Sequence, residues 1–251
     1  MKRILVTGGS GFVGRHLIRS LLNRYPNVEV TSLSRSEGGI SKLLSEVSSP
    51  RLNLRMADIR DYDSVRCTLK GKDTVIHLAA MKRVDLCEEQ CEEAATINIL
   101  GTINILKGFD GDTFILMSTD KAVEPCNCYG ATKLVAERLV MQRASDSTNG
   151  QRFMVIRSGN VLGSTGSVLD IWVSQIRLNN EITVTDPNMK RFYVSVDRVA
   201  ELYLAVLEKG ENHKVYFTPQ GDPTVLKDVI AEALKVYGNE QTRVRYIGLR
   251  Q

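Results

Sequence analysis

Short apolar segments alternate with segments of helical periodicity through the first 157 residues of the chain. The apolar segments are five or six residues long and lie at residues 3–7, 28–33, 52–56, 74–78, 113–117 and 153–157. Between these segments, apolar side chains recur every three or four positions, which predicts four helices. They lie at residues 12–22, around Val65 and Leu69, at 93–107 and at 131–144. Because parallel strands need long crossover connections, this pattern predicts an α/β fold with a Rossmann-type, doubly wound parallel sheet of six strands.

The alternation ends after Arg157. Residues 158–167 are polar and rich in glycine. The segments that follow predict strands at 182–185, 192–196, 215–218 and 243–247 and helices at 199–208 and 225–237. We therefore expect a Rossmann domain at residues 1–157 and a smaller, mixed α/β lobe at residues 158–251, with some segments of the lobe returning to the first domain.

Composition and charge narrow the class of protein. The 251 residues include 43% hydrophobic and 25% charged side chains, as in ordinary globular domains. The net charge of +4 is small and dispersed, whereas nucleic-acid binding needs a concentrated basic face. No apolar run approaches the ~20 residues that span a bilayer, and the amino terminus lacks a signal-peptide pattern. We expect a cytoplasmic protein that binds neither nucleic acid nor membrane.

The cysteines, at positions 67, 87, 91, 126 and 128, are odd in number. Cys87 and Cys91 lie four positions apart, and Cys126 and Cys128 flank one residue, so the two pairs do not match the usual zinc-binding spacing. In a cytoplasmic chain this favours reduced thiols and no metal site.

A glycine pattern separates the first predicted strand from the first predicted helix. Gly8, Gly11 and Gly14 have the spacing of a dinucleotide-binding loop, in which the glycines allow a tight turn, a close approach of a pyrophosphate and close packing of the helix. The helix amino terminus offers N–H groups and the positive end of its dipole to the phosphates. We therefore expect the loop residues Gly8, Ser10, Gly11, Phe12, Val13 and Gly14 to bind the cofactor.

The end of the second predicted strand distinguishes NADP from NAD. An NAD site usually has an acidic residue there, but this chain has Ser34, Arg35 and Ser36. A guanidinium and two hydroxyls suit the 2′-phosphate of NADP, so NAD is the less favoured cofactor. Further along the cofactor we expect Asp58 and Ile59 after the third strand and Leu78, Ala79 and Ala80 after the fourth.

Candidate catalytic residues follow the fifth predicted strand. Tyr129 and Lys133 lie four positions apart and share one face of a predicted helix. A cationic lysine beside a phenol lowers the pKa of the phenol from about 10 and favours a tyrosinate, which can accept a proton from a sugar hydroxyl. Thr119 at the strand end can hold the same oxygen. We expect Tyr129 and Lys133 to contact the cofactor as well.

The motifs together resemble those of the extended short-chain dehydrogenase/reductase superfamily over almost the whole chain. A narrower resemblance is carried by residues 118–122 (Ser118-Thr119-Asp120-Lys121-Ala122), 129–133, 159–164 and 186–192. They are similar to the UDP-N-acetylglucosamine 4,6-dehydratase group, in particular its 5-inverting branch, among the nucleotide-sugar dehydratases and epimerases of polysaccharide biosynthesis. The pair Asp120-Lys121 is the most diagnostic feature, because 4-epimerases of the superfamily usually lack it.

The resemblance implies an NADP-dependent enzyme that oxidises C4 of the sugar, eliminates water across C5 and C6 and returns the hydride to C6. Lys121 would be the base at C5, and Asp120 would be the acid that protonates the departing C6 hydroxyl. The base must be neutral and the acid protonated when they act. Because an ion pair favours the opposite charge states, we expect the two side chains to point to different parts of the sugar.

Other site residues are also implied by the resemblance. Lys82 would bind cofactor and substrate, and Asn98 would bind or support the cofactor site. Asn160, Arg191 and Arg250 would bind the substrate, with Arg191 as a bidentate clamp on the diphosphate. The family pattern has a cation where this chain has Thr165 and continues beyond Arg250, so we expect a truncated or reduced substrate lobe.

Two alternatives to a UDP-N-acetylglucosamine 4,6-dehydratase stay open at this stage. The first is a UDP-sugar 4-epimerase or another nucleotide-sugar oxidoreductase. The second is a cofactor-binding protein without turnover, whose reduced lobe does not close on a substrate. The superfamily resemblance also implies a homo-oligomer, either a dimer through helices beside the sheet or an assembly of dimers.

Overall fold

The computed structural model describes residues 2–147, 150–218 and 221–248. The chain divides into two compact units, which we describe separately. The sheet unit comprises Met1–Ser158 and Asp197–Thr218, and the small unit comprises Gly159–Val196 and Pro219–Gln251. No helix within the described residues is both long enough and apolar enough to cross a membrane.

The sheet unit alternates strands and helices. Its strands are β1 (Arg3–Thr7), β2 (Glu29–Ser34), β3 (Leu52–Met56), β4 (Thr74–His77), β5 (Thr113–Thr119), β6 (Arg152–Ser158) and β11 (Lys214–Phe217). Its helices are α1 (Phe12–Arg24), α2 (Glu37–Glu46), α3 (Tyr62–Leu69), α4 (Val84–Glu89), α5 (Cys91–Ala95), the π-helical turn η1 (Thr96–Leu100), α6 (Gly101–Gly108), the 3₁₀ turn η2 (Asp120–Ala122), α7 (Cys128–Ser145) and α9 (Val196–Lys209).

In the described residues, seven strands form the central sheet in the order β11-β6-β5-β4-β1-β2-β3. Every neighbouring pair is parallel. The prediction of a Rossmann-type doubly wound sheet is therefore confirmed, with β11 as an additional seventh strand beside β6. The chain reverses direction across the sheet between β1 and β4, and ligands of such folds bind at the carboxyl ends of the strands near this point.

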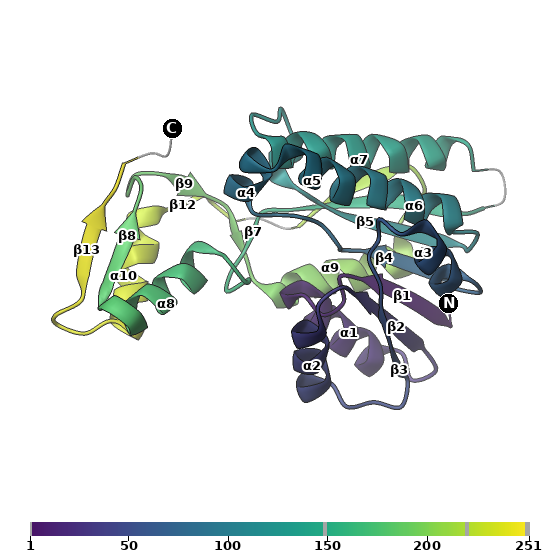
Figure 1. Ribbon diagram of the computed structural model, residues 1–251, viewed down its shortest axis with the longest axis horizontal. Coiled ribbons are helices and arrows are strands. Elements are labelled where there is room, and N and C mark those ends of the chain that lie inside the picture. Colours follow the sequence, from purple (N-terminus) through teal and green to yellow (C-terminus); the bar gives the residue numbers. More distant parts are fainter. Residues whose placement is uncertain (1, 148–149, 219–220, 249–251) are drawn as a thin grey trace. The chain divides into compact units, whose positions relative to one another are not determined.

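Helices cover both faces of this sheet. Figure 1 shows α1, α2 and α9 on one face and α3, α5, α6 and α7 on the other. On the first face, the hydroxyl of Tyr25 after α1 donates to Glu208 in α9 (2.9 Å). On the second face, the core contains Phe109, Phe114 and Phe153, each at most 2% exposed, with aromatic ring centroids about 6 Å apart.

Some elements differ from the sequence prediction. The helices α2 and α4 were not predicted; α2 contains Gly38 and Gly39, which weaken the helical signal, and Ser36 caps it by accepting from the N–H of Gly39 (3.1 Å). The helix predicted at residues 93–107 is present as α5, η1 and α6, and the π-helical turn interrupts its regular hydrogen bonding.

The small unit has its own core. It contains α8 (Val168–Asn179), α10 (Leu226–Tyr237) and the short strands β7 (Asn160–Val161), β8 (Glu181–Val184), β9 (Lys190–Arg191), β10 (Tyr193–Val194), β12 (Thr224–Val225) and β13 (Arg243–Tyr246). Strands β8 and β13 pair in parallel, and Trp172 of α8, 1% exposed, packs with residues of β8 and α10. The strand predicted at residues 192–196 is present in shorter form as β10, and β9 lies on the other side of Phe192. The helix α8 was not predicted.

The turn between β1 and α1 requires glycine at two positions for different reasons. Gly8 has φ of +68°, a conformation that side chains disfavour, and its N–H donates to the carbonyl of Leu33 (2.8 Å). A Cβ on Gly14 would lie 2.5 Å from the carbonyl oxygen of Gly8 and 2.6 Å from that of Gly9. Gly14 therefore lets α1 pack closely on the loop itself.

We expect Gly14→Ala to destabilise the protein, because the added methyl would force the loop away from α1. The free energy of unfolding should fall by about 1–3 kcal/mol, measured by urea denaturation. Gly38→Ala is the matched control. A Cβ there meets nothing within 4 Å, and alanine is the better helix former, so stability should rise by about 0.4–1 kcal/mol. Equal effects of the two substitutions would contradict the tight packing at Gly14.

Candidate active site

The glycine loop is joined to the end of β2 by a short polar network. The N–H of Ser10 donates to the hydroxyl of Ser34 (3.0 Å), and the carbonyl of Ser10 accepts from the guanidinium of Arg15 (2.8 Å). Arg15 is 5% exposed and also donates to Glu46 (2.9 Å). Gly11 is the N-cap residue of α1 and, as glycine, has no side chain to cap the first N–H groups.

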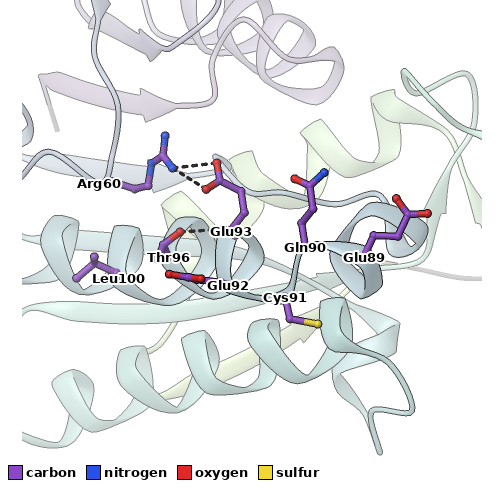
Figure 2. Close-up of a pocket in the computed structure, with 8 residues that line it drawn as sticks. All are labelled: Arg60, Glu89, Gln90, Cys91, Glu92, Glu93, Thr96 and Leu100. Carbon is purple, nitrogen blue, oxygen red and sulfur yellow. Dashed lines mark hydrogen bonds and ion pairs between the residues drawn. The ribbon is translucent and has the colours of Figure 1, made fainter.

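Asp58 lies at the centre of a charged cluster beside Arg35. The guanidinium of Arg60 donates to both carboxylate oxygens of Asp58 (3.0 and 2.7 Å), and Arg35 lies farther away, at 3.5 Å. The hydrogen bonds from Arg60 lower the pKa of Asp58 from 3.8 to about 2. Arg60 also donates to Glu93 of α5 (2.9 Å), as Figure 2 shows. Arg35 is 61% exposed, so its guanidinium is accessible to a ligand.

The pocket in Figure 2 lies beside this cluster. It has a volume of about 650 Å³ and is lined by Arg60, Glu89, Gln90, Cys91, Glu92, Glu93, Thr96 and Leu100. These lining residues are separate from the five predicted catalytic residues, which gather around the start of α7. The pocket is therefore not the place where those residues would meet a substrate.

The loop after β4 approaches the glycine loop. A Cβ on Gly8 would lie 2.8 Å from the N atom of Ala79, and the N–H of Ala79 donates to the hydroxyl of Thr7 (3.3 Å). The same Thr7 hydroxyl is 2.6 Å from Nδ1 of His77, whose Nε2 is 3.1 Å from the hydroxyl of Thr102. Burial, together with the charge of Lys133, lowers the pKa of His77 to about 3, so this histidine is a neutral, hydrogen-bonded core residue.

Asn98 in the π-helical turn η1 connects three segments. Its Oδ1 accepts from the N–H of Met81 (2.8 Å), and its Nδ2 donates to the carbonyl of Met81 (2.9 Å) and to the hydroxyl of Thr132 (3.0 Å). The side chain is 1% exposed. Asn98 thus holds the loop after β4 against α7.

Thr119, Asp120 and Lys121 form a compact turn at the end of β5. The hydroxyl of Thr119 donates to Oδ1 of Asp120 (2.9 Å), and the ammonium of Lys121 donates to the same oxygen (3.0 Å). The expectation that Asp120 and Lys121 point in different directions is therefore wrong in this structure. The 3₁₀ turn η2 places the two neighbouring side chains together, and both are about one-third exposed.

The first turn of α7 brings Tyr129 to this cluster. Asn127 caps the helix by accepting from the N–H of Gly130 (2.8 Å), and a Cβ on Gly130 would collide with the carbonyl oxygen of Lys121. Tyr129 and Thr119 share a side-chain hydrogen bond. The four residues from Tyr129 through Thr119 and Asp120 to Lys121 are therefore linked by one continuous chain of hydrogen bonds.

The protonation of Tyr129 differs from the prediction. Burial and the negative charge of Asp120 raise the pKa of Tyr129 to about 12, although the hydrogen bond with Thr119 opposes the rise. The prediction that Lys133 lowers the pKa of Tyr129 is therefore wrong for the protein alone. Lys133 is 2% exposed, and burial lowers the pKa of its ammonium to about 8, against the opposing effect of the Glu137 carboxylate.

Glu137 and Arg157 were missed by the sequence analysis. The guanidinium of Arg157, at the end of β6, donates to both carboxylate oxygens of Glu137 (2.8 and 2.6 Å), and the Glu137 side chain is 4% exposed. Tyr129, Lys133 and Glu137 recur every four positions along α7 and so lie on one face of the helix. This spacing was the sequence signal that could have identified Glu137; no comparable signal pointed to Arg15 or Arg60.

The remaining predicted site residues are distributed over both units. In the sheet unit, Phe12 and Val13 begin α1, Ser36 caps α2, Ile59 packs in the core, Leu78 and Ala80 flank Ala79, and Lys82 is exposed on the same loop. In the small unit, Asn160 donates through Nδ2 to the carbonyl of Phe192 (3.1 Å), and Arg191 is exposed on β9. Arg250 lies outside the described residues.

The family model for "Polysaccharide biosynthesis protein" matches residues 4–251. The chain belongs to this polysaccharide biosynthesis protein family. A relative named UDP-glucose 4-epimerase, from Rickettsia bellii, is 33% identical over 99% of this chain and 74% of its own length.

Solved structures agree with this family assignment. The X-ray structure of Pen from Bacillus thuringiensis is 32% identical, covers 99% of this chain and 80% of its own, and has a TM-score of 0.92. DesIV, a dTDP-glucose 4,6-dehydratase from Streptomyces venezuelae with NAD and TYD bound, shares the fold at 24% identity over 99% of this chain and 85% of its own, with a TM-score of 0.90. The resemblance to extended short-chain dehydrogenases/reductases is confirmed by the family match and by the UDP-glucose 4-epimerase relative.

We expect Arg60→Gln to raise the pKa of Asp58 from about 2 toward its ordinary value of 3.8, because the hydrogen bonds from Arg60 are lost. Carboxyl NMR titration measures this directly. Arg35→Gln is the control and should give a much smaller rise, because Arg35 is the more distant partner. A carboxyl with a lowered pKa stabilises the fold above pH ~4, and this stabilisation, about 2 kcal/mol, is lost as the pH falls toward ~2. An unchanged pKa in Arg60→Gln would refute the assigned cause.

Proposed function

We propose that this protein is an NADP-dependent 4,6-dehydratase of UDP-N-acetylglucosamine. The observation that carries the proposal is the hydrogen-bonded chain from Tyr129 through Thr119 and Asp120 to Lys121. A reaction at C4, C5 and C6 of one sugar needs proton acceptors and donors at neighbouring carbons, and this chain supplies them side by side. Oxidation at C4 alone would not need Asp120 and Lys121.

The features around the glycine loop support binding of a dinucleotide. Gly8 has a backbone conformation suited to the tight turn, and the amino terminus of α1 has no N-cap side chain at Gly11. Lys133 is a buried cation on the face of α7 that also carries Tyr129. The dinucleotide, when bound, would accept a hydride from C4 of the sugar and return it to C6.

The charges near Arg35 favour NADP over NAD. The residues at the end of β2, Ser34, Arg35 and Ser36, offer two hydroxyls and a guanidinium but no carboxylate for ribose hydroxyls. Asp58 is the nearby carboxylate, and Arg60 already holds both of its oxygens. Arg35 can therefore turn from Asp58 to a 2′-phosphate without leaving Asp58 unpaired.

In the first chemical step, Tyr129 would take the proton of the C4 hydroxyl. The phenol is protonated in the protein alone, since its pKa is about 12. Formation of the phenolate therefore depends on positive charge brought into the site or retained by Lys133. Thr119 hydrogen-bonds with Tyr129 and can hold the same sugar oxygen in place.

In the elimination, Lys121 would remove the C5 proton while Asp120 protonates the C6 hydroxyl, which leaves as water. The observed ion pair holds the same number of protons as a neutral amine beside a carboxylic acid. Moving one proton from Lys121 to Asp120 therefore produces both the base and the acid. Desolvation by a bound sugar favours this neutral pair, because burial penalises charged forms.

A UDP-sugar 4-epimerase is the second candidate. It is supported by the name of the Rickettsia bellii relative, which is similar over nearly the whole chain. An epimerase would use Tyr129, Thr119 and Lys133 in the same way but would return the hydride to C4. The ion pair of Asp120 and Lys121 would then be structural, and its removal would leave the reaction at C4 intact.

We further propose that Lys82 contacts the cofactor and substrate, and that Asn160 and Arg191 of the small unit bind the sugar or its diphosphate. Arg191 is exposed and carries a guanidinium suited to two phosphate oxygens. A homo-oligomer is also part of the proposal. It is supported by the exposed apolar side chains Leu100, Ile103 and Val135 on η1, α6 and α7, which are 38–43% exposed.

Incubation with UDP-N-acetylglucosamine and NADP, followed by NMR of the product, tests the proposed reaction. We expect a 4-keto-6-deoxy sugar nucleotide. Lys121→Ala should reduce its formation by about 10²–10⁴-fold, because the base at C5 is lost. Lys214→Ala is the control and should retain full activity, because Lys214 also lies near a carboxylate but its side chain is exposed at the start of β11. Formation of UDP-N-acetylgalactosamine with the C6 oxygen intact would contradict the proposal.

Binding measurements test the cofactor preference. We expect Arg35→Ala to raise the Kd for NADP by about tenfold or more, since a charge-assisted hydrogen bond to phosphate is lost. The Kd for NAD should change little. Arg66→Ala is the matched control, because Arg66 is equally exposed and also has a distant acidic partner, Asp63. Equal weakening of both cofactors by Arg35→Ala would rule out a contact with the 2′-phosphate.

A further inference from the structure

Two cysteine thiols meet beside the start of α7, at a place that the proposed reaction does not use. Cys91 is the first residue of α5, Cys128 is the first residue of α7, and their side chains interact. Glu88 reinforces the contact: its carbonyl accepts from the thiol of Cys91 (3.2 Å), and its carboxylate accepts from the N–H of Cys128 (2.5 Å). Figure 2 shows the Cys91 side chain projecting from the start of α5.

We propose that Cys91 and Cys128 form a reversible disulfide that controls the position of Tyr129. Both residues are hydrogen-bonded to Glu88, although they lie 37 positions apart in the chain and on different helices, so the two cysteines are already neighbours before any oxidation. This site is separate from the proposed reaction. The effect of the disulfide on turnover, however, rests on the proposed function.

The thiols differ in their access to an oxidant. Cys91 is exposed, Cys128 is half-buried, and the neighbouring Cys87 is fully buried. Burial and the contact with Cys91 raise the pKa of Cys128, and burial raises that of Cys87 to about 11. Cys91 is therefore the thiol that a peroxide meets first, and Cys128 is placed to resolve the product.

The reaction with a peroxide balances with two thiols and one oxidant. The Cys91 thiol first ionises, its thiolate attacks one oxygen of hydrogen peroxide, the O–O bond breaks, and the released hydroxide takes up the proton lost in the ionisation to form water. The sulfur of Cys128 then attacks the sulfenic acid at Cys91, and the hydroxyl leaves with the Cys128 proton as a second water. The two cysteines lose two electrons in total, and the peroxide gains them.

The disulfide would act on Tyr129 through the chain. A sulfur–sulfur bond of about 2.05 Å is shorter than any hydrogen-bonded contact between thiols, so its formation must pull Cys128 toward α5. Tyr129 is the next residue, and its hydrogen bond with Thr119 starts the chain to Asp120. Misplacement of a reacting group by about 1 Å can cost roughly 10²-fold in rate.

Disulfides that involve other exposed cysteines are the alternatives that the test must distinguish. Cys126 is exposed and lies two positions before Cys128, and Cys67 is exposed on α3. Within the described residues, no three His, Cys, Asp or Glu side chains form a group that could hold a metal ion. Oxidation chemistry therefore fits the Cys91–Cys128 contact better than metal binding.

Peptide mapping after treatment of the intact protein with hydrogen peroxide tests the disulfide. We expect a linked pair of peptides that contains Cys91 and Cys128, with the loss of two hydrogen atoms, and its disappearance after dithiothreitol. Cys91→Ser and Cys128→Ser should each abolish the link, whereas Cys126→Ser and Cys67→Ser should retain it. A link through Cys126, or sulfinic acid at Cys91 without any link, would overturn the proposal.

Hydrogen exchange of the first turn of α7 tests the structural effect without any assay of turnover. Oxidation should change the exchange of residues 128–132 in the unmodified protein but not in Cys91→Ser. Where the reduced protein converts a sugar nucleotide, oxidation should also lower its rate by about tenfold or more, and dithiothreitol should restore it. If the disulfide is found but hydrogen exchange is unchanged, the disulfide does not control the position of Tyr129. If the proposed reaction does not occur at all, peptide mapping and hydrogen exchange still test the disulfide.

Discussion

The bidentate ion pair of Arg157 with Glu137 fastens α7 to the end of β6 and so positions the residues on the same face of that helix. Both donor–acceptor distances are at most 2.8 Å, and the carboxylate is almost fully buried. Removal of one member of such a buried pair costs about 3–5 kcal/mol, because the other charge stays buried without compensation. One turn before Glu137 lies Lys133, and one turn earlier lies Tyr129. The location of the phenol beside β5 therefore depends on an ion pair two turns away.

From this anchor, polar contacts continue to the end of β5. Asn98 holds α7 against the loop after β4, and Thr119 hydrogen-bonds with Tyr129. Asp120 and Lys121 extend the chain within one short turn. A single framework thus holds the residue that would act at C4 close to the pair that would act at C5 and C6. The proposed dehydration is the reaction that uses every member of this chain.

The strands of the sheet and the glycine loop could be predicted from the sequence because their signals are local. Each of the six predicted strands lies in a short segment with at least three apolar residues, and the three loop glycines have a recognisable spacing. Apolar periodicity could not predict the inward face of α7, since this face buries Lys133 and Glu137 where periodicity expects apolar side chains; only their four-residue spacing from Tyr129 pointed to them. The α8 helix was missed although Ser167 offers a capping hydroxyl, which accepts from the N–H of Asp170.

Protonation states and pairings depend on contacts that no local pattern reveals. Tyr129 has a raised pKa because burial and Asp120 outweigh the help of Thr119. Asp58 has a lowered pKa because Arg60, two positions along the chain, folds back onto its carboxylate. The spacing of Tyr129 and Lys133 correctly placed both on one helix face. It could not show that the charge acting on the pKa of Lys133 is that of Glu137, or that Lys133 does not lower the pKa of Tyr129.

The central claim, that one site oxidises C4 and eliminates water across C5 and C6, is tested most directly with UDP-N-acetylglucosamine that carries deuterium at C4. The account predicts that NMR and mass spectrometry will find this deuterium at C6 of a 4-keto-6-deoxy product, with the C6 oxygen lost. Deuterium that returns to C4 in an epimerised sugar, with the C6 oxygen retained, would contradict it.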